Sequence, residues 1–99
     1  MQYEGYETKK EDQVEFQGAV ITEQGQTFGI IIVKPTVLNS PSSREEMTAF
    51  GIRAFGLMPI VLMAQDSNGV PTYSGRTDIV RFLANIFVEQ IPWRKYTIS

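Results

Sequence analysis

The fold is decided by two apolar stretches, TFGIIIV at residues 27–33 and PIVLMA at residues 59–64. Both are rich in β-branched residues and carry apolar side chains on both faces, which is typical of strands buried inside a sheet. Residues 39–58 connect them and contain a helical pattern. A connection of this length permits a parallel pair with a right-handed crossover. We therefore expect a mixed sheet with helices packed on it.

Shorter strand patterns flank the two apolar stretches. Residues 14–20 alternate between apolar and other side chains, which predicts a strand with one wet face, and residues 22–26 form a turn around Gly25. After a second turn at residues 65–69, a strand is expected at residues 70–73. Pro71 lacks a backbone donor, so this strand is predicted to lie at an edge of the sheet.

Two helices are expected between and after these strands. Ser40 can cap the first, Pro41 suits its first turn, and Gly56 ends it. The second opens at residues 74–78, shows a wide apolar face, and is predicted to run to residues 91–92. The tail that follows is read as a short edge strand. The fold class is therefore α+β, with a mixed four- to five-stranded sheet, two helices and the order β-β-α-β-β-α(-β).

Length and composition exclude several classes of protein. The chain has 99 residues, a net charge of −2, and neither cysteine nor histidine. Without cysteine there is no disulfide, Cys-ligated zinc or thiol nucleophile, and without histidine the commonest general base and metal ligand are missing. The acidic balance argues against nucleic acid as a partner. No apolar run is long enough for a membrane span or a signal peptide, so we expect a cytoplasmic protein.

The amino terminus differs from the rest of the chain. Residues 1–12 are predicted to be an arm, and residues 13–99 to be a single α+β domain. Acidic residues and lysines dominate the arm, which favours a solvated and mobile segment. The other interpretation is an arm that docks on another subunit through Tyr3 and Tyr6.

The apolar surplus of the two buried strands bears on association. If both helices pack on one face of the sheet, the other face exposes aliphatic side chains to water. Such a patch most often closes as a symmetric dimer, sometimes a tetramer. If the helices divide between the faces, a monomer suffices. We expect the homo-oligomer, with a small molecule or a protein as a further partner and no cofactor.

One ligand pocket is predicted at the carboxyl ends of the two buried strands, where open α/β sheets usually bind ligands. Lys34 follows the first strand, Gln65 and Asp66 follow the second, and Trp93 with Arg94 follows the last helix. The plainer interpretation is that Asp66 makes a turn, Lys34 is solvated and Trp93 packs on the core.

A second candidate site is YSGRTD at residues 73–78, which includes Tyr73. Arg76 at a helix start is suited to hold a carboxylate or phosphate. The plainer interpretation is an ordinary capped helix with Arg76 in solvent.

The chain is similar to small bacterial proteins of unassigned activity carried on integron gene cassettes. The similarity rests on four stretches: TFGIIIVKP at 27–35, PIVLMAQD at 59–66, YSGRTDIVRFLA at 73–84 and IPWR at 91–94. It implies a stand-alone, often oligomeric fold, sometimes with a ligand pocket. No functional residue is carried over.

A further likeness covers residues 50–86, where FGIR, a strand opened by Pro59, a hairpin, a glycine and a helix resemble the carboxyl-terminal half of a thioredoxin-like domain. In that family the proline is cis and faces the active site. The cysteine pair and the amino-terminal strand–helix unit are missing here, so the likeness implies a redox-inactive domain.

Three functions remain open from the sequence. The expected one is a non-catalytic homo-oligomeric module that binds a small molecule or a protein partner. The second is a small enzyme that uses Asp66 with Lys34, or Arg76 as an anion clamp. The third is the redox-inactive thioredoxin-like domain.

Overall fold

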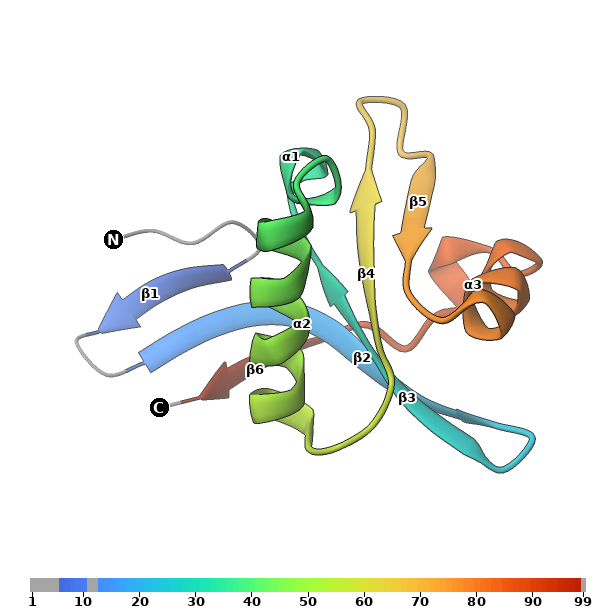
Figure 1. The fold of residues 1–99 in the computed structure, drawn as a ribbon, viewed down its shortest axis with the longest axis horizontal. Helices are drawn as coiled ribbons and strands as arrows, with labels where there is room; N and C mark the ends of the chain where they lie inside the picture. Colours follow the sequence, from blue (N-terminus) through green and yellow to red (C-terminus); the bar gives the residue numbers. More distant parts are fainter. Residues whose placement is uncertain (1–5, 11–12, 99) are drawn as a thin grey trace.

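The computed structural model describes the backbone of residues 6–10 and the whole of residues 13–98. Six strands form one mixed sheet in the order β1-β2-β3-β4-β5, with β6 also paired to β2 (Figure 1). The strands are β1 (Tyr6–Lys10), β2 (Gln13–Glu23), β3 (Gln26–Ile32), β4 (Ile60–Gln65), β5 (Pro71–Ser74) and β6 (Arg94–Ile98). The helices are α1 (Pro35–Leu38), α2 (Pro41–Phe55) and α3 (Thr77–Ala84), with a 3₁₀ turn η1 (Val88–Gln90). The predicted α+β class with a mixed sheet is confirmed, and the order of elements matches broadly; strand β1 and the short helix α1 are additions that the sequence did not predict.

The centre of the sheet is the pair β3–β4, which is parallel, whereas the other pairs are antiparallel. Gly29 lies opposite Ile60, and Ile32 lies opposite Met63. The connection between them contains α1 and α2, as a parallel pair requires. The two apolar stretches thus form adjacent strands with both faces buried.

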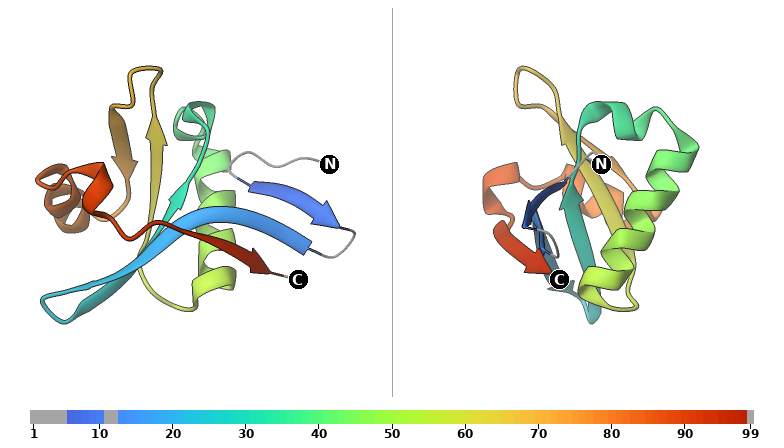
Figure 2. Two further views of the ribbon diagram at one scale, coloured as in Figure 1. Left: turned by 180° about the vertical axis from the view of Figure 1, so that it is seen from behind. Right: turned by 90° about the vertical axis from the view of Figure 1, so that its left-hand side faces the viewer.

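The helices divide between the two faces of the sheet, with α2 on one side and α3 on the other (Figure 2). The face under α2 is covered by a cluster built around Phe16, Ile31, Met47, Phe50 and Leu62. The face under α3 is covered by a second cluster built around Phe28, Ile30, Val61, Met63 and Leu83. Of the two arrangements left open by the sequence, the helices therefore adopt the divided one, in which a monomer suffices. The homo-oligomer stays a prediction, and a bare sheet face no longer supports it.

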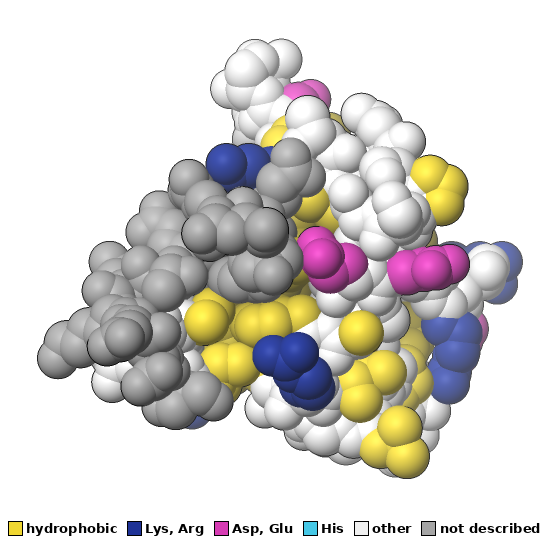
Figure 3. All heavy atoms as spheres, turned by 60° about the vertical axis from the view of Figure 1, so that its left-hand side comes forward, with side chains coloured by type: hydrophobic (Ala, Val, Ile, Leu, Met, Phe, Trp, Pro, Cys, Tyr) yellow, Lys and Arg dark blue, Asp and Glu magenta, His cyan; other side chains and the backbone are white. Residues whose placement is uncertain are grey.

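Large apolar side chains are nevertheless exposed outside these clusters. Leu57 is 94% exposed between α2 and β4, Phe87 is 74% exposed after α3, and Val70 is 56% exposed in the β4–β5 hairpin. On the face shown in Figure 3, apolar side chains alternate with charged and other polar ones. Val20 on β2 and Ile52 on α2 are also exposed, at 38% and 37%, so the exposed apolar side chains lie on a strand and a helix as well as on connecting segments.

Helix α2 begins and ends where the sequence predicts. The Ser40 hydroxyl accepts a hydrogen bond from the backbone N–H of Ser43, and Pro41 is the first helical residue. Gly56 ends the helix with a φ of 101°, a conformation that favours glycine.

Helix α3 is shorter than predicted: it ends at Ala84, whereas the sequence predicts an end near residue 91. The Asn85 side chain donates to the carbonyl of Arg81, and this local bond competes with a further helical turn. Phe87 then donates its backbone N–H to the side chain of Gln90 in η1. The apolar spacing of residues 86 and 87 matches a helix, but Phe87 is exposed and packs on neither face.

Strand β1 lies within the stretch for which an arm is predicted. It pairs antiparallel with the first half of β2, with Tyr6 opposite Phe16. Residues 1–5 and 11–12 lie outside the described residues. The predicted docking through Tyr3 and Tyr6 concerns side chains that are likewise outside the described part of the chain.

Candidate functional site

A hollow of about 440 Å³ lies between the β2–β3 hairpin and helix α3. In Figure 1 this hairpin projects beyond the rest of the sheet, on the side of the molecule where α3 lies. Both elements contribute to its walls: Glu23, Gln24, Gln26 and Phe28 from the hairpin, and Asp78, Ile79, Arg81, Phe82 and Asn85 from α3 and its end.

The hairpin wall is set by a tight two-residue turn. Gln24 and Gly25 both have positive φ, 51° and 78°, as the preferred hairpin turns require. This turn places Glu23 directly opposite Gln26. Directly opposed residues share a face of the sheet, and so do residues two apart on one strand. Glu23, Gln26 and Phe28 therefore point to the side of the sheet that α3 covers.

The helix wall stands close to the sheet because of Gly75. A Cβ atom at Gly75 would lie 2.9 Å from Cγ2 of Val61, so only glycine lets the chain cross β4 this tightly. Ile79 of α3 is buried against the sheet, and the Phe82 ring meets the Phe28 ring edge-on at a centroid distance of 6.4 Å. These three apolar side chains form the floor of the hollow.

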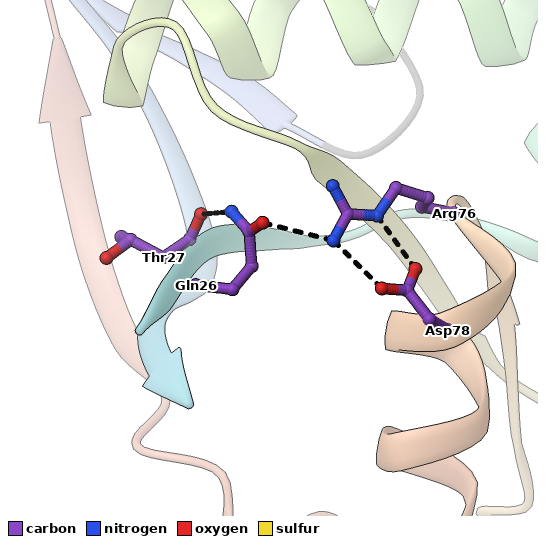
Figure 4. Close-up of polar contacts among 4 residues, drawn as sticks. All are labelled: Gln26, Thr27, Arg76 and Asp78. Carbon is purple, nitrogen blue, oxygen red and sulfur yellow. Dashed lines mark hydrogen bonds and ion pairs between the residues drawn. The ribbon is translucent and has the colours of Figure 1, made fainter. Parts of the chain in front are cut away.

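A polar network joins the helix wall to the hairpin wall (Figure 4). Arg76 donates to Asp78 twice, from Nε to Oδ1 at 2.7 Å and from Nη2 to Oδ2 at 2.9 Å. Nη2 also donates to Oε1 of Gln26 at 3.1 Å, and Gln26 Nε2 donates to the Thr27 carbonyl. The start of α3 is thus tied to a residue fifty positions earlier in the chain.

The network fixes the charges of its two ionic members. The hydrogen bond from Arg76 lowers the pKa of the Asp78 carboxyl below its usual range, and the same bond raises the pKa of Arg76. Asp78 is therefore ionised, and its two carboxylate oxygens accept from Nε and Nη2 of Arg76. Any anion bound by Arg76 would have to compete with this bidentate pair. Arg76 consequently acts as a positioning residue of the wall.

Replacing Arg76 with glutamine is expected to raise the pKa of Asp78 towards that of an ordinary aspartate, because the hydrogen bond that stabilises the carboxylate is lost. A ¹³C NMR titration of the side-chain carboxyl measures this pKa directly. In the native protein the stabilisation is present above the unfolded-state pKa and is lost as the pH falls through the lowered folded pKa. Arg53→Gln on α2 is the control, and an unchanged titration in Arg76→Gln would contradict the assignment.

Three residues of the strand-end pocket predicted from the sequence lie at one end of the sheet. Val33 donates its N–H to the carbonyl of Met63, so Lys34 comes level with the end of β4, where Gln65 and Asp66 follow. Lys34 is exposed at the start of α1.

The polar side chains at this end serve the β4–β5 turn. Oδ1 of Asp66 accepts the backbone N–H groups of Asn68 and Val70 at 2.8 and 3.0 Å. Nε2 of Gln65 donates to the carbonyl of Gly69. This is the plainer interpretation of Asp66, a turn residue whose carboxylate closes the hairpin.

The remaining predicted site residues lie elsewhere. Trp93 packs against the cluster under α3, and its indole N–H donates to the Val88 carbonyl at 2.9 Å. Arg94 begins β6 opposite Gly18. Tyr73 packs against the same cluster. Its buried hydroxyl has no hydrogen-bond partner among the described residues, and burial raises the pKa of this phenol. Of the second candidate site at residues 73–78, Asp78 lines the hollow, and Arg76 lies beside it through its bonds to Asp78 and Gln26.

Most residues of the hollow were not singled out from the sequence. Glu23 and Gln26 are a cross-strand pair, while Arg81 and Asn85 are one helical turn apart on α3. Each pattern is visible locally, but neither indicates that the hairpin and the helix face one another. That information comes from the side of the sheet on which α3 packs.

Within residues 13–98, no group of acidic side chains has the arrangement needed to hold a metal ion. None of the helices in the described part of the chain combines the length and apolar character of a membrane span. The chain matches no protein-family model, no curated protein and no solved structure. The resemblances to integron-cassette proteins and to thioredoxin-like domains stay predictions.

Proposed function

We propose that this chain is a non-catalytic module that binds a small molecule in the hollow between the β2–β3 hairpin and α3. The observation that carries the proposal is the composition of the hollow. It has an apolar floor of Phe28, Ile79 and Phe82 beneath a rim of amide, carboxylate and guanidinium groups. Small-molecule sites commonly combine an apolar lining with a few converging polar groups, and a volume of about 440 Å³ suits such a ligand.

The polar groups of the chain favour binding over catalysis. Arg76 and Asp78 hold one another in a bidentate pair, and Asp66 accepts two backbone amides of its own turn. These bonds engage the polar atoms of both groups within the protein and fix them in place, whereas a general acid or base has to exchange a proton with a substrate. The small enzyme based on Asp66 with Lys34 is therefore the less favoured proposal.

The proposal includes the assembly and location expected from the sequence. We propose a homo-oligomer, a dimer or tetramer, that works in the cytoplasm. Exposed Leu57 and Phe87 support the association, because large apolar side chains at such exposure gain by contact with a partner.

A thermal-shift screen with metabolites tests the proposal. A ligand at one hundred times its dissociation constant stabilises the protein by about 2.7 kcal/mol, which raises the melting temperature of a domain of this size by several degrees. Each hit is then measured on Arg81→Trp, where the indole is expected to fill the hollow and abolish the shift.

Arg53→Trp is the matched control. Arg53 is an exposed arginine in the last turn of α2, as Arg81 is in the last turn of α3, so both variants lose the same charge from the last turn of a helix. The hits are expected to stabilise Arg53→Trp as they do the native protein. Equal shifts in both variants, or no hit on the native protein, would contradict the proposed site.

A further inference from the structure

The charges around the hollow are not equivalent. The negative charge of Asp78 is balanced by the guanidinium of Arg76 in their bidentate pair. Glu23 on the hairpin wall and Arg81 on the helix wall also line the hollow, and the side chain of neither makes an ion pair or hydrogen bond with another residue of the described chain. These two side chains are therefore the ones left to meet charged groups of a ligand.

The two available charges have opposite signs and come from opposite walls. A carboxylate of a ligand fits the fork of the Arg81 guanidinium, and an ammonium fits the carboxylate of Glu23. The charges of Glu23 and Arg81 sum to zero. The pair therefore favours a ligand that carries one charge of each sign over a ligand with a net charge. A single-charge ligand would satisfy one wall and leave the other unmatched.

The floor between the walls is apolar and aromatic. Phe28 is buried and Phe82 is half-buried. The two rings meet edge-on, and both residues line the hollow. Because Phe28 is only 2% exposed, a ligand's apolar body would gain mainly by covering the accessible part of the Phe82 ring, in proportion to the area removed from water. A ligand that fits all three parts has two opposite charges and an apolar body.

We infer that the hollow recognises a small zwitterion with an apolar side chain, of the class of the large apolar α-amino acids. The ammonium lies against Glu23, the carboxylate against Arg81 and the side chain over Phe28 and Phe82. This inference rests on the proposed function and names the class of ligand for the same site.

Four probes that share one phenyl ring separate the contributions. L-Phenylalanine carries both charges, phenylethylamine only the ammonium, 3-phenylpropionate only the carboxylate, and N-acetylphenylalanine amide neither. Affinities are measured at low salt by amide chemical-shift titration of the whole chain. Phenylalanine is expected to bind about two- to fivefold more tightly than either single-charge probe, the range that one exposed ion pair contributes.

Two variants assign each preference to a side chain. Glu23→Gln is expected to remove the preference for phenylalanine over 3-phenylpropionate, and Arg81→Gln the preference over phenylethylamine. Arg53→Gln is the matched control and should preserve both preferences.

The outcomes separate this inference from the proposed function. If all four probes shift the amides of the hollow with equal affinity, the inferred zwitterionic ligand is wrong, but the proposed binding site is still supported. The same conclusion holds if the variants leave the preferences unchanged. If no probe shifts these amides but compounds from the thermal-shift screen do, the ligand class is again wrong and the proposed function stands. If neither set binds there, both are wrong.

Discussion

Replacing Leu62 with lysine is expected to unfold the protein. Leu62 lies on β4, is 1% exposed and belongs to the cluster under α2. An unpaired ammonium at this position has no partner in an apolar core, and burial of such a charge costs several kcal/mol. Small domains are stable by only about 5–15 kcal/mol, so most of that stability would be lost. Circular dichroism during thermal unfolding measures the effect, and the same loss is expected for Ile31→Lys on β3.

These substitutions therefore report on folding and not on assembly. Leu57→Lys is the matched control, because Leu57 is 94% exposed and the new charge stays in water. It is expected to keep the native circular dichroism spectrum, and light scattering is expected to show a smaller particle than for the native protein, because Leu57 supports the proposed homo-oligomer. A Leu62→Lys protein with a native melting curve would contradict the burial of β4 within a single chain.

Replacing Gly18 with alanine is expected to destabilise the protein by about 2–3 kcal/mol, the upper part of the range for overpacked sites. A Cβ atom at Gly18 would lie 2.4 Å from the carbonyl oxygen of Ile30, which is backbone. Gly18 also pairs with β3 on one side and β6 on the other. Relief of the clash must move a strand that is held at both edges, so the cost cannot be relaxed locally.

Gly51→Ala provides the matched control within a helix. Its Cβ would lie 2.8 Å from Cδ1 of Ile31 and from Cγ2 of Ile60, which are side-chain atoms of the core and not backbone. Overpacking of such a site typically costs about 1–3 kcal/mol, and alanine regains about 1 kcal/mol of helix propensity over glycine. We therefore expect Gly51→Ala to lose about 0–2 kcal/mol in urea unfolding, less than Gly18→Ala. If Gly18→Ala is as stable as Gly51→Ala, the close approach of β2 to β3 is not as the structure has it.

The fold could be predicted from the sequence wherever the signal is local. The two apolar stretches became β3 and β4, and the Ser40 cap and Gly56 mark the bounds of α2. The side of the sheet on which each helix packs could not be predicted, because a strand buried on both faces shows the same pattern whichever helix covers it. The end of α3 depended on the Asn85 side chain, which the apolar spacing of residues 86 and 87 concealed.

The candidate site was predicted only in part, for a related reason. Arg76 was recognised because a charged residue at a helix start is a local feature. The partners of Arg76 include Gln26, which lies fifty positions away and reaches it only through the tertiary structure. The turn role of Asp66 was also visible from the sequence, since aspartate before Ser-Asn-Gly favours a hairpin turn.

The hollow between the β2–β3 hairpin and α3 is proposed to hold a small molecule. The most direct measurement is a crystal structure of the protein with the strongest hit of the thermal-shift screen. The predicted result is electron density for the ligand over Phe28 and Phe82, with Glu23 or Arg81 in contact. Density instead beside Lys34 and Gln65, at the ends of β3 and β4, would contradict this account and favour the strand-end pocket.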